Sequence, residues 1–98
     1  MIVVRDVFHL KFGNAAEAKA LWKEGREISR KLNHPPMRIM TDLVGTYYTL
    51  AMESQYENLT AYENMMKQTF GSAEWKQWYQ KFVPLVESGF REMFHVEE

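Results

Sequence analysis

MIVVRDVFHLKF, residues 1–12, alternates between two kinds of side chain, and this alternation decides the fold. In an extended strand, successive side chains point to opposite faces of the sheet. One face then holds the large apolar residues Ile2, Val4, Phe8, Leu10 and Phe12. The other face is half apolar and half basic: Val3, Arg5, Val7, His9 and Lys11. The first face predicts a packed core, and the second raises the question of what covers it.

Composition limits the classes of protein to which the chain can belong. Its 98 residues predict one domain, residues 1–98, and 46% of them are hydrophobic, which is enough for a packed core. A net charge of −1, from 12 basic and 13 acidic residues, argues against a nucleic-acid partner. Without cysteine there is no disulfide or thiolate chemistry. The sequence shows no apolar run of about 18 residues and no secretory signal. We therefore expect a cytoplasmic protein with no membrane partner.

The pattern along the chain predicts alternating strands and helices. The first strand ends at Gly13, and a helix with Asn14 as its N-cap runs to the Pro35-Pro36 pair. A hairpin follows, with strands at residues 37–44 and 46–53. Ser54 and Glu57 form a capping box that starts the next helix, and Ser72 caps another that ends near Pro84. After a turn at residues 88–89, a last strand covers residues 90–96.

This order predicts an α+β, ferredoxin-like βαββ(αα)β fold with a four-stranded antiparallel sheet. The helices cover the face of the sheet that holds Phe8, Leu10 and Phe12, and the tryptophans lie at helical spacing in that core. The opposite face holds Val3, Val7, Met40, Ala51 and either Met93 or Phe94. A second copy of the chain is the partner that we expect to cover it, because two such sheets form a closed, symmetric α/β barrel.

Three stretches carry a resemblance to a known family: VFHLKFGNAAEA (7–18), PPMRIMTDLVGTYYTLAMES (35–54) and ESGFREMFHVEE (87–98). Through them the chain resembles the dimeric α/β-barrel superfamily, in particular its NIPSNAP-like and antibiotic-biosynthesis-monooxygenase-like members. The resemblance covers the whole chain in element order. It implies a homodimer but no single activity, because the superfamily hosts several chemistries.

Polar residues on the uncovered face are the candidate site. We expect ligand-binding roles for the following: Arg5, Arg38, Asp42, Tyr47, Thr49, Glu53 and Arg91. Arg91 and His95 line the barrel if one face of the last strand points inward, and Glu92 does so if the other face does. An anionic or phenolic ligand would suit Arg5, Arg38 and Tyr47. The alternative is that these charges only pair with one another across the dimer.

His9 is the candidate general base, since histidine is the side chain that most often takes this role near neutral pH, although a single structural hydrogen bond would also explain it. The three histidines are scattered, so we expect no metal site. We also expect no cofactor, because no histidine falls on a predicted helix where the haem-binding branch of the superfamily holds iron. The sequence therefore predicts a homodimer that binds a small organic molecule, with or without cofactor-independent monooxygenase-type chemistry. The alternative is a structural or partner-binding dimer whose barrel is filled by its own side chains.

Overall fold

The fold is known from a computed structural model, which describes residues 1–97. The elements follow the order β1 (Ile2–Leu10), α1 (Ala15–Lys31), β2 (Met37–Thr41), β3 (Thr49–Tyr56), α2 (Leu59–Phe70), α3 (Ala73–Phe82) and β4 (Val86–His95). A 3-10 turn at Val83–Leu85 joins α3 to β4. The α+β, ferredoxin-like arrangement expected from the sequence is confirmed.

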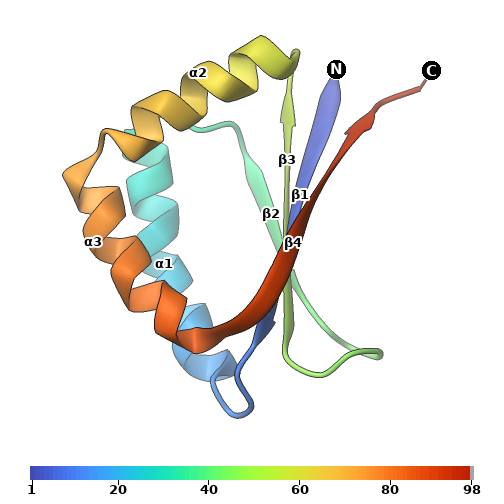
Figure 1. Cartoon of the computed structure of the whole chain (residues 1–98), viewed down its shortest axis with the longest axis vertical. Coiled ribbons are helices and arrows are strands. Elements are labelled where there is room, and N and C mark those ends of the chain that lie inside the picture. The colour runs from blue at the N-terminus through green and yellow to red at the C-terminus, as the bar shows by residue number, and fades with distance from the viewer. Residues whose placement is uncertain (98) are drawn as a thin grey trace.

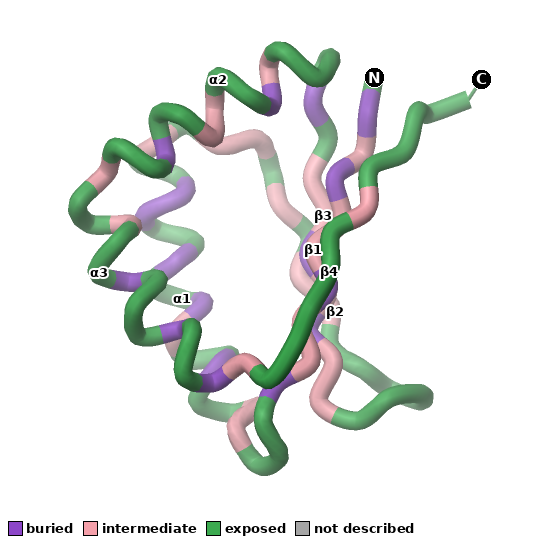
Figure 2. Tube along the Cα trace, in the orientation of Figure 1, coloured by how far each residue is buried: buried purple, intermediate pink, exposed green. Residues whose placement is uncertain are grey.

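The four strands form one antiparallel sheet in the order β2-β3-β1-β4. Within residues 1–97, all three helices stand on one side of this sheet, and no element covers the other side (Figure 1). Burial follows the same division, because buried positions lie along the helices and the central strands while β4 is mostly exposed (Figure 2). We call the uncovered side the open face.

The core lies between the helices and the sheet, as the alternation of residues 1–12 predicts. Its main cluster joins β1 and β3 to the helices through Leu10, Leu50, Trp22, Trp78 and Phe82. A smaller cluster at the other end of the strands contains Ile2, Val4, Tyr56 and Tyr62. Phe12, which was expected on the same face, lies beyond the end of β1 and is 76% exposed.

The predicted hairpin has shorter strands than the sequence suggests. β2 ends at Thr41 and β3 begins at Thr49, so residues 42–48 form a loop. The loop is closed by the Asp42 carboxylate, which accepts a hydrogen bond from the Thr49 backbone N–H at 3.0 Å. Gly45 and Tyr48 both have positive φ there, a conformation that an extended strand excludes.

The predicted capping box at residues 54–57 is wrong, because β3 continues to Tyr56. Ser54, Gln55 and Tyr56 pair with Val4, Val3 and Ile2, and this pairing places Tyr56 in the core. Helix α2 is instead capped by Asn58, whose side chain accepts a hydrogen bond from the Ala61 N–H at 2.9 Å. A longer sheet that buries an aromatic side chain outweighs a local cap preference.

The predicted turn at residues 88–89 is also wrong, since both residues lie inside β4. Ser88 pairs with His9, and Gly89 pairs with Phe8. A Cβ atom on Gly89 would lie 2.7 Å from the carbonyl oxygen of Val7. Glycine is therefore needed here for close approach of two strands rather than for a turn.

Candidate functional site

A cavity of about 570 Å³ lies between the helices and the sheet. Every layer of the fold contributes to its wall. The sheet supplies Val4, Asp6, Phe8, Met52 and Arg91, and the helices supply Trp22, Ser29, Tyr62, Met66, Thr69, Trp75, Trp78 and Phe82. The wall is mostly apolar with a few polar groups, which is the usual construction of a small-molecule site.

The helix side of the cavity is a wall of aromatic rings from α1 and α3. The ring centroids of Trp22 and Trp78 are 4.3 Å apart, and those of Trp75 and Trp78 are 5.0 Å apart. Trp78 is held in place by its indole N–H, which donates to the backbone carbonyl of Leu21 at 2.7 Å. The tryptophans are therefore core residues, as their helical spacing predicts, and they also line the cavity.

Three buried polar atoms without a hydrogen-bond partner belong to residues of this wall. Among the described residues they are Trp22 Nε1, Ser29 Oγ and Tyr62 Oη. A buried polar group without a partner costs about 1–3 kcal/mol, so such atoms are uncommon in folded proteins. All three residues line the same cavity, although the three atoms themselves have almost no solvent-accessible surface.

An ion pair on the sheet side adds charge to the cavity. Arg91 of β4 donates from Nε to the Asp6 carboxylate at 2.6 Å, and its guanidinium lies 5.8 Å from the ring centroid of Tyr62. Desolvation lowers the pKa of Arg91, but the hydrogen bond and the charge of Asp6 outweigh this effect and raise it overall. Burial raises the pKa of Tyr56 and of Tyr62, so both phenols stay protonated at neutral pH.

His34 lies in the loop after α1 and forms another polar part of the wall. Its Nε2 atom is 2.6 Å from the hydroxyl of Thr69, which itself donates to the backbone carbonyl of Met65 at 2.9 Å. The backbone N–H of His34 donates to the carbonyl of Ser29 at 3.0 Å. Desolvation by burial lowers the pKa of His34, which favours the neutral ring at pH 7.

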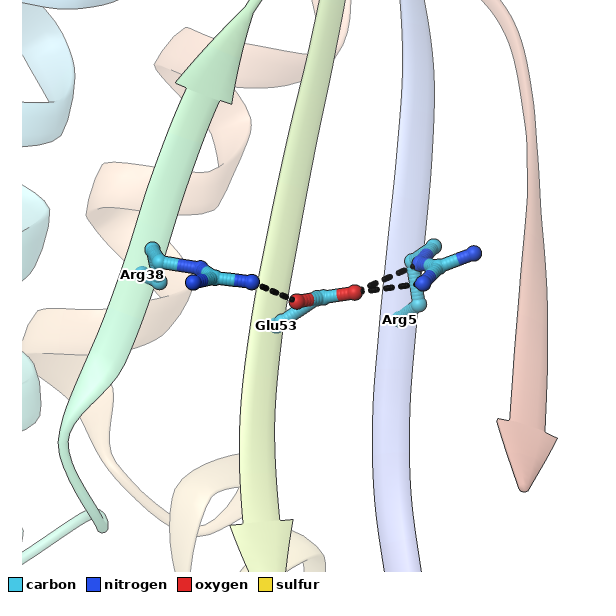
Figure 3. Close-up of polar contacts among 3 residues, drawn as sticks. All are labelled: Arg5, Arg38 and Glu53. Carbon is cyan, nitrogen blue, oxygen red and sulfur yellow. Dashed lines mark hydrogen bonds and ion pairs between the residues drawn. The ribbon is translucent and has the colours of Figure 1, made fainter.

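The open face holds a separate cluster of three charges, Arg5, Glu53 and Arg38 (Figure 3). Glu53 of β3 lies opposite Arg5 of β1 on one side and Arg38 of β2 on the other. The ion-pair distances are 2.6 Å to Arg5 and 2.8 Å to Arg38. Hydrogen bonds from Arg5 and Arg38 lower the pKa of Glu53. The three residues satisfy one another within a single chain.

The other predicted site residues are spread over the molecule. His9 lies on the open face with its Nδ1 atom 3.2 Å from the Ser88 hydroxyl. Asp42 and Thr49 bond to each other at the end of the hairpin, and Tyr47 is 73% exposed in the loop. Of the eight predicted residues, only Arg91 lines the cavity. The pairing of Arg91 with Asp6 also shows which residues of β4 lie on each face of the sheet. Arg91 lies on the helix side, and Glu92, which lies opposite Arg5, lies on the open face.

Sequence reasoning did not select the polar residues around the cavity, Asp6, Ser29, His34, Tyr62 and Thr69. Alternation within β1 alone places Asp6 on the helix side, between Val4 and Phe8. To place Arg91 there, the register of β4 against β1 must be known. The other four residues come from α1, its following loop and α2. Only the packing of those helices on the sheet brings them together.

Residues 1–97 contain no group of three or more His, Cys, Asp or Glu residues that could hold a metal ion. Within the same range, no helix is both long and apolar enough to cross a membrane.

Comparison with known proteins places the chain among relatives of the same fold. The family model described as NIPSNAP matches residues 5–94. A NIPSNAP family protein from Agrobacterium tumefaciens superimposes with a TM-score of 0.93 at 15% identity, covering 99% of this chain and 86% of that one. A NIPSNAP domain protein from Burkholderia xenovorans gives 0.91 at 15% identity, covering 99% and 95%. A structure described as an antibiotic biosynthesis monooxygenase gives 0.77 at 10% identity, covering 100% of both chains. No curated protein matches the chain by sequence.

Proposed function

We propose, from the premise that the chain belongs to the NIPSNAP family, that it binds a small, largely aromatic molecule in the cavity between the helices and the sheet. The observation that carries this proposal is the cavity itself, about 570 Å³ in volume and lined mostly by apolar and aromatic side chains. Small-molecule sites usually have volumes of about 300–1,000 Å³. The rings of Trp22, Trp75 and Trp78 offer flat apolar contacts to an aromatic ligand.

Arg91 supports a ligand that also carries an acidic or other oxygen-bearing group. The ion pair with Asp6 uses Nε of Arg91, which leaves the terminal guanidinium nitrogens for a ligand oxygen. The Arg91 side chain is 49% exposed, so it lies where the cavity meets solvent. A guanidinium presents a fork of N–H donors that suits a carboxylate. The sequence predicts a ligand-binding role for Arg91 on the open face, and the proposal assigns it that role at a different site, on the helix side of the sheet.

The open face supports a homodimer that closes an α/β barrel. Its apolar side chains include Phe90 and Phe94 of β4, which are 50% and 43% exposed. Val3, Val7, Met40 and Ala51 lie on the same face by strand register. A second copy would cover this apolar surface and place His9, Arg5 and Arg38 inside the dimer. A ligand-binding or catalytic role for these residues stays a prediction.

Monooxygenase-type chemistry is the second candidate, favoured by the likeness of the fold to structures described as antibiotic biosynthesis monooxygenases. At 10% and 12% identity this likeness shows the fold alone. Adding a quinol such as 1,4-dihydroxynaphthalene distinguishes binding from turnover. Turnover should consume dissolved oxygen faster than the same quinol does in buffer without protein. A ligand-binding protein without chemistry leaves that rate unchanged.

Thermal unfolding in the presence of bicyclic probes tests the binding proposal. We expect 2-naphthol and 2-naphthoic acid to raise the Tm, by roughly 6–11 °C at ten times the Kd, because ligand that binds only the folded state stabilises it. Met66→Trp fills the cavity and should abolish the shift, whereas Met65→Trp, the same change at a neighbouring residue outside the lining, should retain it. Each variant is compared with its own ligand-free Tm. No shift with either probe, or equal shifts in the two variants, would contradict the proposal.

A further inference from the structure

We propose that His34 is the residue that recognises the ligand's hydroxyl group, so that the ligand class is a hydroxyaromatic compound whose O–H donates to Nδ1 of His34. This inference rests on the proposed function and deepens it. It names the atom that makes the contact and the chemical group that the contact selects.

The hydrogen bonds around Thr69 fix which nitrogen of His34 carries the proton. A threonine hydroxyl has one hydrogen, and the Thr69 hydroxyl donates it to the Met65 carbonyl at 2.9 Å. In the contact of 2.6 Å with His34, Thr69 Oγ1 must therefore accept, and Nε2–H of His34 must donate. A neutral imidazole has one N–H, so Nδ1 is left with a lone pair that can only accept.

Nδ1 of His34 is also accessible. No described residue forms a hydrogen bond with it, and it is not among the fully buried atoms that lack a partner. His34 lines the cavity, and the proposal places this accessible acceptor on the surface that a ligand meets. Desolvation keeps the ring neutral at pH 7, which preserves the lone pair.

The ring of His34 has little freedom to change its direction. Its Nε2 atom is held by Thr69, and its plane packs edge-on against Trp75 at a centroid distance of 5.7 Å. Its backbone N–H is held by the carbonyl of Ser29. The residue that follows is Pro35, which restricts the backbone of His34 to extended conformations. A preorganised acceptor next to an aromatic wall fits a flat ring that carries a hydroxyl group.

The tautomer can be tested on the wild-type protein without any ligand. Long-range ¹H–¹⁵N correlation at pH 7.5 should show His34 as the neutral ring with its proton on Nε2, with His34→Phe assigning the signals. Thr69→Val removes the acceptor and should give a mixture of tautomers, while Thr69→Ser, which keeps the hydroxyl, should not. A proton on Nδ1, or a doubly protonated ring, would overturn the inference.

Paired ligands test the recognition step. By calorimetry we expect wild-type protein to bind 2-naphthol about tenfold more tightly than 2-methoxynaphthalene. The methoxy compound has no O–H to donate, and the loss of one hydrogen bond corresponds to a difference in Kd of about this size. His34→Phe should bind the two equally, and Thr69→Ser should keep the preference. Equal binding of both probes to the wild type would overturn the role of His34 and leave the proposed function standing. Binding of neither probe would overturn this inference, and if 2-naphthoic acid also gives no thermal shift, the proposed function is overturned with it.

Discussion

Glu53 shows at the scale of one residue how the sheet fixes side-chain partners. It lies on a central strand between Arg5 and Arg38, and its side chain is 14% exposed although those of its partners are 40% and 72% exposed. Alternation in the sequence predicts that all three residues share a face. It does not predict that they lie directly opposite one another, because that depends on the register of three strands.

Acid should selectively remove the stabilisation that Glu53 provides. Hydrogen bonds from Arg5 and Arg38 lower the pKa of Glu53 in the folded state. The stabilisation that the Glu53 carboxylate provides is therefore present above its ordinary pKa of 4.5, and it is lost as the pH falls through its lower pKa in the folded protein. We expect Glu53→Gln to lower the free energy of unfolding by about 1 kcal/mol at pH 7 and by nothing measurable at pH 2.5. Urea denaturation at the two pH values measures this.

Glu57→Gln is the matched control, because Glu57 is exposed and makes no ion pair within the described residues. It should leave the free energy of unfolding unchanged at both pH values. An equal loss for Glu53→Gln at pH 7 and pH 2.5 would show that the charge of Glu53 is not the source of its effect.

At the scale of elements, the contact between α1 and α3 shapes the cavity wall. Gly25 of α1 is buried against the rings of Trp22 and Trp78. A Cβ atom there would lie 2.8 Å from both Trp22 Cε3 and Trp78 Cζ2. Trp78 cannot easily retreat, because its indole N–H is bonded to the carbonyl of Leu21. The absence of a side chain at Gly25 therefore lets the two helices hold their rings together.

Gly25→Ala should destabilise the protein even though alanine favours a helix by about 1 kcal/mol. Overpacking in a core costs about 1–3 kcal/mol, so we expect a net loss of roughly 1 kcal/mol in the free energy of unfolding. Thermal and urea denaturation measure it. Gly71→Ala is the control, because a Cβ atom there would meet only ordinary contacts of 3.5 Å or more, and we expect no loss. A Gly25→Ala variant as stable as the wild type would contradict the packing described here.

The order of the elements could be predicted from sequence, but several of their ends could not. Helix α3 begins after Ser72, whose hydroxyl accepts from the Trp75 N–H, because that cap is local. In contrast, Ser54 resembles a cap in sequence but lies in a strand, since it pairs with Val4, fifty residues earlier in the chain. Gly89 resembles a turn residue but is required by the neighbouring strand. A local sequence pattern cannot predict the role of a residue whose strand partner lies far away in the sequence.

At the scale of the whole molecule, the sheet has one covered face and one open face with exposed phenylalanines. We predict that the protein is a dimer at micromolar concentration, by light scattering across a dilution series. Ala51→Arg places a charge at the centre of the open face, between Val7 and Met40, and should weaken the dimer at least tenfold. Leu43→Arg, a change in an exposed loop residue, should leave it intact. A wild-type monomer throughout the series would contradict the closed barrel.

The cavity is a property of the whole molecule that the sequence does not reveal. The sequence correctly indicates the family and the side of the sheet on which the helices pack. The volume of the cavity depends on the distance between the helices and the sheet, which the sizes of many side chains set together. For this reason the sequence does not point to His34, Ser29 or Tyr62, and it predicts Arg91 as a ligand-binding residue of the open face rather than of this cavity.

The most direct test of the account is the position of a bound probe. With methionine methyl groups labelled with ¹³C, intermolecular NOEs from the ring protons of 2-naphthol report which methionines lie beside it. Met52 and Met66 line the cavity, whereas Met40 lies on the open face. We predict NOEs to Met52 and Met66 and none to Met40. NOEs to Met40 without those to Met52 and Met66, or no intermolecular NOE under conditions of saturation, would contradict the cavity as the ligand site.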